Sequence, residues 1–284
     1  MTSTTFNEKS SFTADGVAYR RTFTDLPYAK EIFEILKAIR GPIDISSMEQ
    51  TAPYRTAPMF ESRYILTDRE LEKSGVKQIL ELAGGLSSRG FVMAMKPDVI
   101  YVELDLPEKS ALKTEVLERL AIKLNTRVPS NLYLEKGNVI DEKAFKKACR
   151  LFNSGPIAVI CEGLLRYMDR EDQQKLSLHI YSLLKKHGGL WITPDIERLS
   201  DVEKTPGMSA RYDRWIKQAG IDIRKNIFKD DADAVSSFEN LGFKVTKYSQ
   251  LEVIDKLTSP TKLGLTREEV NEYLKHRDTF VMRV

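Results

Sequence analysis

The chain has 284 residues, of which 42% are hydrophobic and 30% are charged, as is ordinary for a globular protein. Its 44 basic and 41 acidic residues are spread along the chain and leave a formal charge of +3, which excludes the basic stripe of nucleic-acid-binding proteins. No apolar run approaches the roughly 20 residues that span a bilayer, so a membrane protein is excluded as well.

The N-terminal part of the chain is predicted to be helical. Its first 25 residues lack the apolar segment of a secretory signal, so we expect a partly ordered arm of a cytoplasmic protein. Apolar residues recur at helical spacing from Leu26 to Arg40, and a second helix is expected from about Met59 to Ser74, where Gly75 ends it. Residues 1–75 are therefore expected to form an arm and a helical cap.

From residue 76 onward, short apolar runs alternate with helical segments. Five strands are expected, at Gln78–Ala83, Val99–Leu104, Asn131–Glu135, Ile157–Cys161 and Leu190–Thr193. Pro107, Asp141 and Asp169 mark the starts of three of the helices between them. Because parallel strands are joined by crossover helices, the alternation predicts a doubly wound, Rossmann-like α/β sheet with helices on both faces.

The last third of the chain departs from this alternation. A polar insertion at about 197–230 precedes a strand at Phe243–Tyr248 and a terminal strand at Thr279–Val284, which we expect to run antiparallel to the sheet. The insertion is interpreted as a lid over the ligand site. Residues 76–284 are then one core, and with residues 1–75 the whole chain is predicted to be a single domain.

The turn after the first strand has the composition of a ligand-binding turn. It reads ELAGGLSSRG over 81–90, and ligands of doubly wound sheets bind beyond the carboxyl ends of the strands. Gly84 and Gly85 allow a close approach of the backbone to a ligand, and Ala83 is small. Asp105 ends the next strand, where a carboxylate can accept hydrogen bonds from the ribose of an adenosine-containing cofactor. Each signal alone is weak, because plain tight turns and solvated strand-end carboxylates are common.

The same turn departs from the G-x-G-x-x-G pattern of dinucleotide sites. Ala83 and Ser88 stand at its first and third glycine positions, which disfavours a pyrophosphate held at a helix N-terminus. S-adenosylmethionine carries no phosphate and needs an open turn near its methionyl end. The turn therefore suits this methyl donor better than a nicotinamide dinucleotide.

Four separated segments form a more specific pattern. They are Ser62-Arg63-Tyr64, the glycine turn with Arg89, VELDLP at 102–107 and CEGLLRYM at 161–168. Together they resemble the leucine carboxyl methyltransferase family, including its bacterial members linked to polyketide O-methylation, over most of the chain. The resemblance implies a class I, S-adenosylmethionine-dependent O-methyltransferase that acts on a carboxylate or hydroxyl oxygen of a small molecule or a peptide C-terminus. The chain departs from the family pattern at Ala83, in place of a glycine, and at Ser87, in place of an aspartate.

The resemblance also implies a role for each matching residue. Arg63 would hold the methionyl carboxylate through a two-pronged ionic hydrogen bond. The donor's other contacts would be Ala83, Gly84 and Gly85 at the methionyl moiety, Asp105 at the ribose, Asn138 and Val139 at the adenine, and Glu162 at the amino group. Two of these residues have ordinary structural alternatives, since Arg63 could be an exposed ion-pair residue and Asn138 a turn residue. Glu162 directly follows a buried strand and must find a partner.

The catalytic candidates are Tyr167, as a contact to the acceptor, and Asp195, as a general base. Methyl transfer from a sulfonium is an in-line displacement that needs alignment and exclusion of water. A carboxylate acceptor needs no base, and the absence of His from the motif turns favours one. In the insertion, Arg211, Tyr212, Arg214 and Trp215 could bind an anionic or aromatic acceptor, or could form a solvated charged face.

No metal site is predicted, because Cys149, Cys161 and the three histidines show no metal-ligand spacing. The two cysteines are expected to be buried free thiols. S-adenosyl-L-methionine is the expected cofactor and a small molecule the expected partner. Two alternatives stay open, a nicotinamide-dependent oxidoreductase and a catalytically idle domain that binds S-adenosylmethionine.

Overall fold

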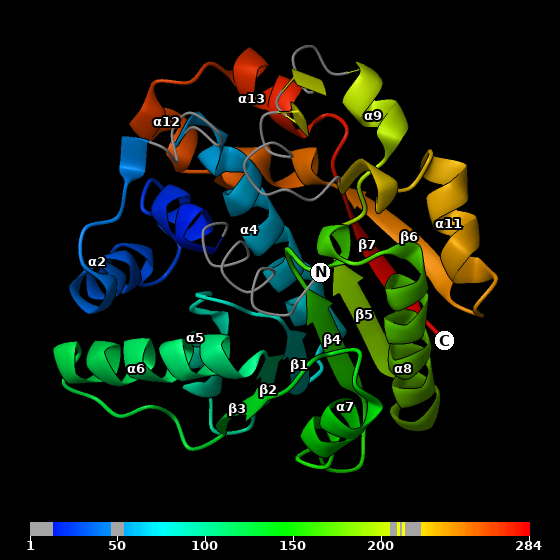
Figure 1. Ribbon diagram of the computed structural model, residues 1–284, viewed down its shortest axis with the longest axis horizontal. Coiled ribbons are helices and arrows are strands. Elements are labelled where there is room, and N and C mark those ends of the chain that lie inside the picture. Colours follow the sequence, from blue (N-terminus) through cyan, green and yellow to red (C-terminus); the bar gives the residue numbers. More distant parts are fainter. Residues whose placement is uncertain (1–13, 47–53, 205–208, 211, 214–222) are drawn as a thin grey trace.

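A sheet lies at the centre of the molecule (Figure 1). The structure is a computed structural model that describes residues 14–46, 54–204, 209–210, 212–213 and 223–284. Within these ranges the strands are β1 (Gln78–Leu82), β2 (Ile100–Asp105), β3 (Leu132–Lys136), β4 (Ile157–Cys161), β5 (Gly189–Thr193), β6 (Lys244–Ser249) and β7 (Asp278–Arg283). Each of the seven strands predicted from the sequence is present, within one or two residues of its predicted bounds.

The strand order is β3-β2-β1-β4-β5-β7-β6, so the winding direction reverses between β1 and β4. Strands β1 to β5 pair in parallel, while β7 runs antiparallel to both β5 and β6. The prediction of a doubly wound, mostly parallel sheet with an antiparallel last strand is confirmed. Leu82 lies level with Leu104 on β2 and with Cys161 on β4. The residues that follow these three strands therefore meet at one edge of the sheet.

Helices occupy most of the chain between the strands. The α-helices are α2 (Ala29–Arg40), α4 (Ala57–Ser74), α5 (Arg89–Ala94), α6 (Pro107–Lys123), α7 (Glu142–Cys149), α8 (Arg170–His187), α9 (Leu199–Lys204), α11 (Asp231–Glu239), α12 (Ser259–Leu263) and α13 (Arg267–Leu274). The 3-10 helices are η1 (Tyr54–Thr56), η2 (Leu165–Tyr167), η3 (Ile223–Lys225) and η4 (Gln250–Lys256), and residues 14–21 are also helical. In the described part of the chain, no helix has both the length and the apolar character needed to cross a membrane.

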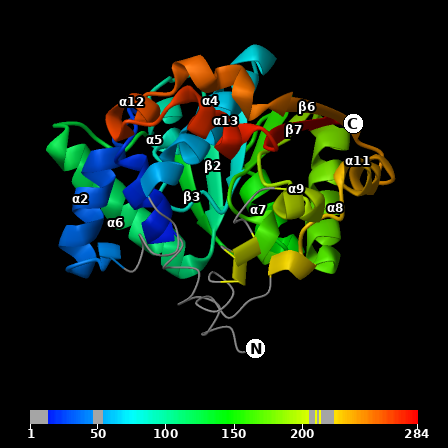
Figure 2. The ribbon, with the colours of Figure 1, turned by 90° about the horizontal axis from the view of Figure 1, so that it is seen from above.

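Alternate residues of each strand pack on opposite faces of the sheet, because strand side chains alternate in direction. On one face, Leu80 and Leu82 join a core formed with α7, α8 and α11. On the other face, Ile79 and Tyr101 join a core formed with α2, α5 and α6. Figure 2 shows α2 and α6 on one side of the sheet and α8 and α11 on the other. The two layers of helices leave the carboxyl edge of the strands as the place where loops gather.

The cap over this edge is built from both ends of the chain. Met59 of α4 lies in a small core with Leu257, Leu265 and Leu274 from the C-terminal helices. Buried Glu61 accepts hydrogen bonds from the backbone N–H and the hydroxyl groups of both Thr258 and Ser259, so it fastens α12 to α4. The helical cap expected from residues 1–75 therefore shares its core with residues 250–277.

Candidate functional site

The glycine turn between β1 and α5 lies at the switch point of the sheet. Ala83 and Gly85 have φ angles of +54° and +52°. The N–H of Gly85 donates to Oδ2 of Asp105 at 3.1 Å, and the N–H of Leu106 donates to Oδ1 at 2.8 Å. A Cβ at Gly85 would meet no atom closer than the Ala83 carbonyl oxygen, 4.0 Å away, so the turn is open on this side. A ligand can therefore approach the backbone at Gly85.

Asp105 has hydrogen-bonding capacity left for such a ligand. A carboxylate offers about four acceptor sites, and the N–H groups of Gly85 and Leu106 use two of them. Burial raises the pKa of Asp105, while the N–H groups of Leu106 and Gly85 oppose that shift. The geometry is that expected of a residue that accepts hydrogen bonds from ribose hydroxyls.

Gly84 serves a different purpose from Gly85. Its φ angle is not positive, and a Cβ at this position would lie 3.0 Å from Oε2 of Glu103 and 3.1 Å from Oε2 of Glu81. The missing side chain of Gly84 thus makes room for two carboxylates beneath the turn. Its role as a donor contact remains a prediction.

Arg89 joins the turn to three neighbouring elements. Its guanidinium is fully buried and pairs with Asp68 of α4 at 2.7 Å, Glu81 of β1 at 2.7 Å and Glu162 after β4 at 3.0 Å. The ring of Tyr64 lies over it, with its centroid 4.2 Å away. A fully buried cation requires such partners, because an unpaired charge in the interior is costly. Arg89 therefore fixes where Glu162 lies.

Glu162 has a second cationic partner, which the sequence analysis missed. Arg21, from the N-terminal helix at residues 14–21, donates to Oε1 of Glu162 at 2.9 Å. Burial opposes the charge of Glu162, but Arg21 and Arg89 outweigh it and hold the pKa of Glu162 below its usual value. The carboxylate is ionised at the position predicted for the donor's amino group. Arg21 belongs to no motif, so only the fold reveals this contact.

Arg63 of α4 is a buried cation with an incomplete set of partners. Its side chain is 4% exposed and lies 3.8 Å from Oε1 of Glu197. Its Nε is buried and has no hydrogen-bond partner among the described residues. The alternative that Arg63 is an exposed ion-pair residue is therefore wrong. A buried guanidinium with an unsatisfied donor fits a carboxylate ligand, because such groups are almost always hydrogen-bonded in a complete site.

Asp195 is buried after β5 and holds the neighbouring motif loop. Its two oxygens accept hydrogen bonds from the N–H groups of Gly163, Leu164 and Leu165 at 2.6, 2.6 and 3.1 Å. Burial raises the pKa of Asp195, while Arg63 and these N–H groups oppose that shift. Tyr167 lies half-buried in η2, directly after this loop. The contacts of Asp195 make it an anchor for the loop that carries Glu162 and Tyr167.

The loop after β3 reaches the same edge of the sheet. The N–H of Gly137 donates to the backbone oxygen of Asp105 at 2.9 Å, which places the next residues beside that carboxylate. Asn138 is exposed, and its Oδ1 accepts from the N–H of Ile140 at 3.2 Å, as in a turn. Val139 is 5% exposed and packs into the core with Leu104. The loop is close enough to Asp105 to take an adenine ring, and this assignment stays a prediction.

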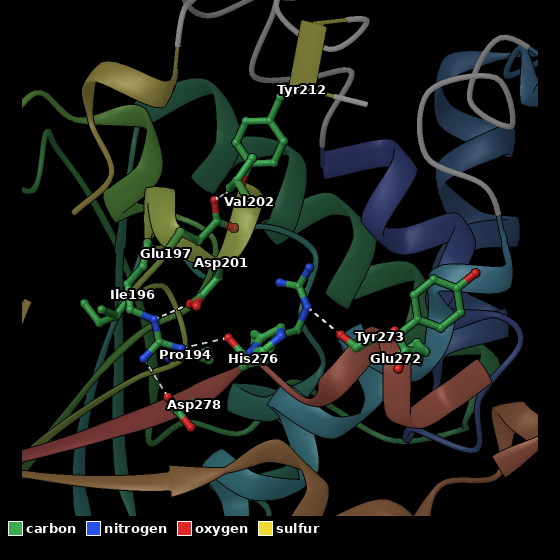
Figure 3. A pocket seen from close by; sticks show the side chains of 12 residues that line it. Pro194, Ile196, Glu197, Asp201, Val202, Tyr212, Glu272, Tyr273, His276 and Asp278 are labelled. Carbon is green, nitrogen blue, oxygen red and sulfur yellow. Dashed lines mark hydrogen bonds and ion pairs between the residues drawn. The ribbon is translucent and has the colours of Figure 1, made fainter. Parts of the chain in front are cut away.

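A pocket of about 40 Å³ lies on the side of the insertion, between the segment after β5 and the end of α13 (Figure 3). Tyr212 donates its hydroxyl proton to Glu197 at 2.6 Å at one wall, and Arg166 lies 3.2 Å from the same carboxylate. Burial opposes the charge of Glu197, but Arg166 and Arg63 hold its pKa below the usual value. Glu197 therefore links Arg63 to the pocket. Of the predicted acceptor cluster, Arg211, Arg214 and Trp215 lie outside the described residues.

The two ends of the insertion are anchored to the core. Arg198 pairs with Asp201, with Asp231 at 2.7 Å and with Asp278 at 2.7 Å, and it donates to the backbone oxygen of His276 at 2.8 Å. Phe228 at the other end is 3% exposed and belongs to the core beside α11. These contacts bring His276 into the pocket wall. The sequence analysis missed this histidine because it lies about 80 residues from the insertion's start.

Comparison with known proteins finds a family resemblance over part of the chain. Residues 45–180 match the model of the leucine carboxyl methyltransferase family. The match covers 136 of the 284 residues, just under half of the chain. That range contains Arg63, the glycine turn, Asp105, the Asn138–Val139 pair and Glu162, so every predicted donor contact lies within the match. Asp195, Glu197 and the pocket of Figure 3 lie outside it.

Two relatives are named provisionally as S-adenosyl-L-methionine-dependent methyltransferases. One, from Mycobacterium ulcerans, is 26% identical over an aligned length of 178 residues, and the alignment covers 57% of this chain and 57% of that protein. The other, from Mycolicibacterium smegmatis, is 28% identical over an aligned length of 189 residues, and the alignment covers 64% of this chain and 60% of that protein. The matched part thus spans less than two thirds of the length of either relative. These matches confirm the predicted resemblance to the family and S-adenosylmethionine as the cofactor.

The fold of this chain also occurs in a solved structure. The crystal structure of a DUF574 family protein from Streptomyces avermitilis superposes with a TM-score of 0.55 and covers 95% of this chain and 96% of that one. The two sequences are 14% identical, so the likeness concerns the fold alone.

Proposed function

We propose that this chain is an S-adenosylmethionine-dependent methyltransferase that transfers the methyl group to a carboxylate or hydroxyl oxygen of a small molecule or a peptide C-terminus. The observation that carries the proposal is Arg63, a buried guanidinium with an unsatisfied Nε beside the switch point of the sheet. A nicotinamide dinucleotide has no carboxylate that could pair with Arg63, whereas the methionyl end of S-adenosylmethionine has one.

The proposed contacts with the donor follow from the residues around the switch point. Arg63 binds the methionyl carboxylate, Glu162 accepts from the ammonium group, and Asp105 accepts from the ribose hydroxyls. The donor also touches the backbone at Ala83, Gly84 and Gly85 and the loop at Asn138 and Val139. When bound, S-adenosylmethionine supplies a methyl group on a positively charged sulfur. The protein's part is to hold both reactants in line and to exclude water.

The acceptor is proposed to enter from the side of the pocket in Figure 3. Glu197 contacts Arg63 on one side and Tyr212 on the other, so this pocket adjoins the proposed methionyl end of the donor. Tyr167 is proposed as an acceptor contact. Asp195 accepts three backbone hydrogen bonds, so we assign it to positioning the loop and not to proton abstraction. A carboxylate acceptor, which is ionised at neutral pH, requires no base.

The test is a transfer assay with methyl-labelled S-adenosylmethionine and a panel of carboxylic and phenolic acceptors. We expect labelled product from at least one oxygen acceptor. Mild base then separates the two chemistries, because it hydrolyses a methyl ester and leaves an aryl methyl ether intact. Donor binding without transfer to any acceptor would favour the idle domain. Binding of NAD(P) without binding of S-adenosylmethionine or S-adenosylhomocysteine would overturn the proposal.

A further inference from the structure

A buried ion pair lies beneath the glycine turn, and the donor contacts proposed above do not use it. Nζ of Lys113, on α6, lies 2.9 Å from Oε2 of Glu103, on β2. The two side chains are 3% and 4% exposed. Oε1 of Glu103 is buried and has no hydrogen-bond partner in the part of the chain that the structure describes. Burying two charges is costly, so a pair in this position calls for a functional explanation.

The pair is connected to the turn itself. Nζ of Lys113 also donates to the backbone oxygen of Ser87 at 2.5 Å, while the N–H of Gly85 is held by Asp105 at 3.1 Å. The turn is thus held at two points two residues apart. It also packs directly on Glu103, because a Cβ on Gly84 would lie 3.0 Å from Oε2 of that residue. A change in this carboxylate is transmitted to the turn without any intervening side chain.

We propose that Lys113 and Glu103 are positioning residues that hold the turn over residues 83–88 in the conformation that binds the donor, so that donor affinity depends on the charge of Glu103. The inference rests on the proposed function, because it concerns the affinity for S-adenosylmethionine. It adds a requirement that the donor contacts alone do not contain, namely that Glu103, which lies beneath the turn and is not itself a proposed donor contact, be ionised.

The surroundings of Glu103 determine the pH at which its carboxyl ionises. Burial raises the pKa of this carboxyl to about 7, Lys113 on α6 lowers it, and Glu81 on β1 and Asp105 on β2 raise it. Arg89 on α5 pairs with Glu81. Other neighbours are uncharged, among them Tyr101 on β2, Leu134 in register on β3 and Gly90 on α5. The carboxyl therefore changes charge close to neutral pH.

Protonation of Glu103 removes the counter-charge of Lys113. A buried ammonium without a partner is unfavourable, so Lys113 is drawn toward water and away from the Ser87 carbonyl. S-adenosylmethionine carries one net positive charge from its sulfonium, ammonium and carboxylate groups. Binding of this cation near Glu103 favours the ionised carboxyl, so donor binding releases protons around pH 7.

The test is calorimetric titration of the full chain with S-adenosylmethionine at pH 6 and pH 8. The variants are Glu103→Gln and Lys113→Met, and the matched control is Arg119→Met, which removes an exposed cation from the same helix. The ratio of the affinities of wild type and Glu103→Gln at one pH cancels the titration of the ligand's own groups. We expect this ratio to rise by about threefold to tenfold from pH 6 to pH 8. Lys113→Met should bind about tenfold more weakly at pH 8, and Arg119→Met should bind normally.

Proton release provides a second readout. Titration near pH 7 in two buffers of different ionisation enthalpy should show more protons released by wild type than by Glu103→Gln. This measurement does not require that Lys113→Met fold. An unchanged affinity ratio across pH, equal proton release, or normal binding by folded Lys113→Met would each overturn the inference and leave the proposed function standing. Failure of the wild-type chain to bind S-adenosylmethionine at either pH would overturn the proposed function, and this inference with it.

Discussion

Burial determines which interactions the guanidinium of Arg63 can make. On an exposed helix face an arginine is worth little, because water screens its ion pairs. At 4% exposure the same side chain has lost its water, and 3.8 Å from Glu197 is too far for a hydrogen bond to replace it. Glu162, Asp195 and Glu197 all lie within reach of its field. These acids surround the guanidinium with negative charge, and its Nε has no hydrogen-bond partner among the described residues.

Replacing Arg63 by alanine should weaken binding of S-adenosylmethionine by about 10- to 100-fold, the effect of losing a charge-assisted hydrogen bond to a carboxylate. Arg69→Ala on the same helix is the control, because Arg69 forms ion pairs with Glu70 and Glu252, neither of which is a proposed donor contact. Calorimetric titration measures both, after the unfolding temperature has shown that each variant folds. Equal affinities of Arg63→Ala and Arg69→Ala would refute the carboxylate assignment.

At the scale of elements, the site depends on how closely α5 packs against β2. A Cβ on Gly90, in the first turn of α5, would lie 2.4 Å from Oε1 of Glu103 and 3.0 Å from the ring of Tyr101. No real Cβ fits there. Gly90 is therefore needed for the packing of α5 against β2. In the sequence GGLSSRG, a glycine needed for packing cannot be distinguished from one that allows a ligand to approach.

Gly90→Ala should therefore lower the free energy of unfolding by about 1–3 kcal/mol, as overpacking of a buried site does. The control is Ser74→Ala, which changes a half-buried residue at the end of α4. Gly75→Ala would not serve, because the φ angle of Gly75 is positive. Urea denaturation measures the difference. A Gly90→Ala protein as stable as wild type would show that α5 can move away from β2 at little cost.

The raised pKa of Glu103 also predicts how stability changes with pH. The folded chain holds this proton up to about pH 7, whereas an unfolded glutamate loses it near 4.5, so between these values the folded state binds more protons. The free energy of unfolding must then fall as pH rises through this window. The loss attributable to Glu103 is about 2–3 kcal/mol, and Glu103→Gln should lack it. Urea denaturation at pH 5 and pH 8 compares the two proteins, and an identical pH dependence would contradict the prediction.

At the scale of the whole molecule, the cap depends on a contact between residues almost 200 positions apart. Glu61 accepts four hydrogen bonds from Thr258 and Ser259 and is 1% exposed. Because α4 also carries Arg63, this contact ties the C-terminal helices to the element that holds the proposed carboxylate ligand. Opening of the cap would therefore disturb donor binding at a distance.

Glu61→Gln should lower the free energy of unfolding by about 2 kcal/mol, because an amide places N–H donors against the donors of Thr258 and Ser259. Glu72→Gln, an exposed change on the same helix, should alter it by less than about 0.5 kcal/mol. Urea denaturation of both variants gives the comparison. Equal stabilities would mean that the apolar contacts of the cap suffice without Glu61.

The sequence by itself determined the α/β layers of this protein and the strand ends at which the donor is proposed to bind. The strands could be found because apolar runs such as Ile157–Cys161 are buried on both faces, and the helix starts because Asp141 and Asp169 cap local backbone. The glycine turn and Asp105 could be paired because parallel strands bring consecutive carboxyl ends to one edge. All of these signals act over a few residues or follow from topology.

Only the tertiary structure decided which charges have partners. Arg21 and Glu162 are 141 positions apart, Glu61 and Ser259 are 198 apart, and His276 reaches the pocket through Arg198. No local pattern encodes such pairs, since a charged side chain looks the same in sequence whether water or a counter-ion surrounds it. The unsatisfied Nε of Arg63 and the buried Lys113–Glu103 pair are visible only once desolvation by the rest of the chain is known.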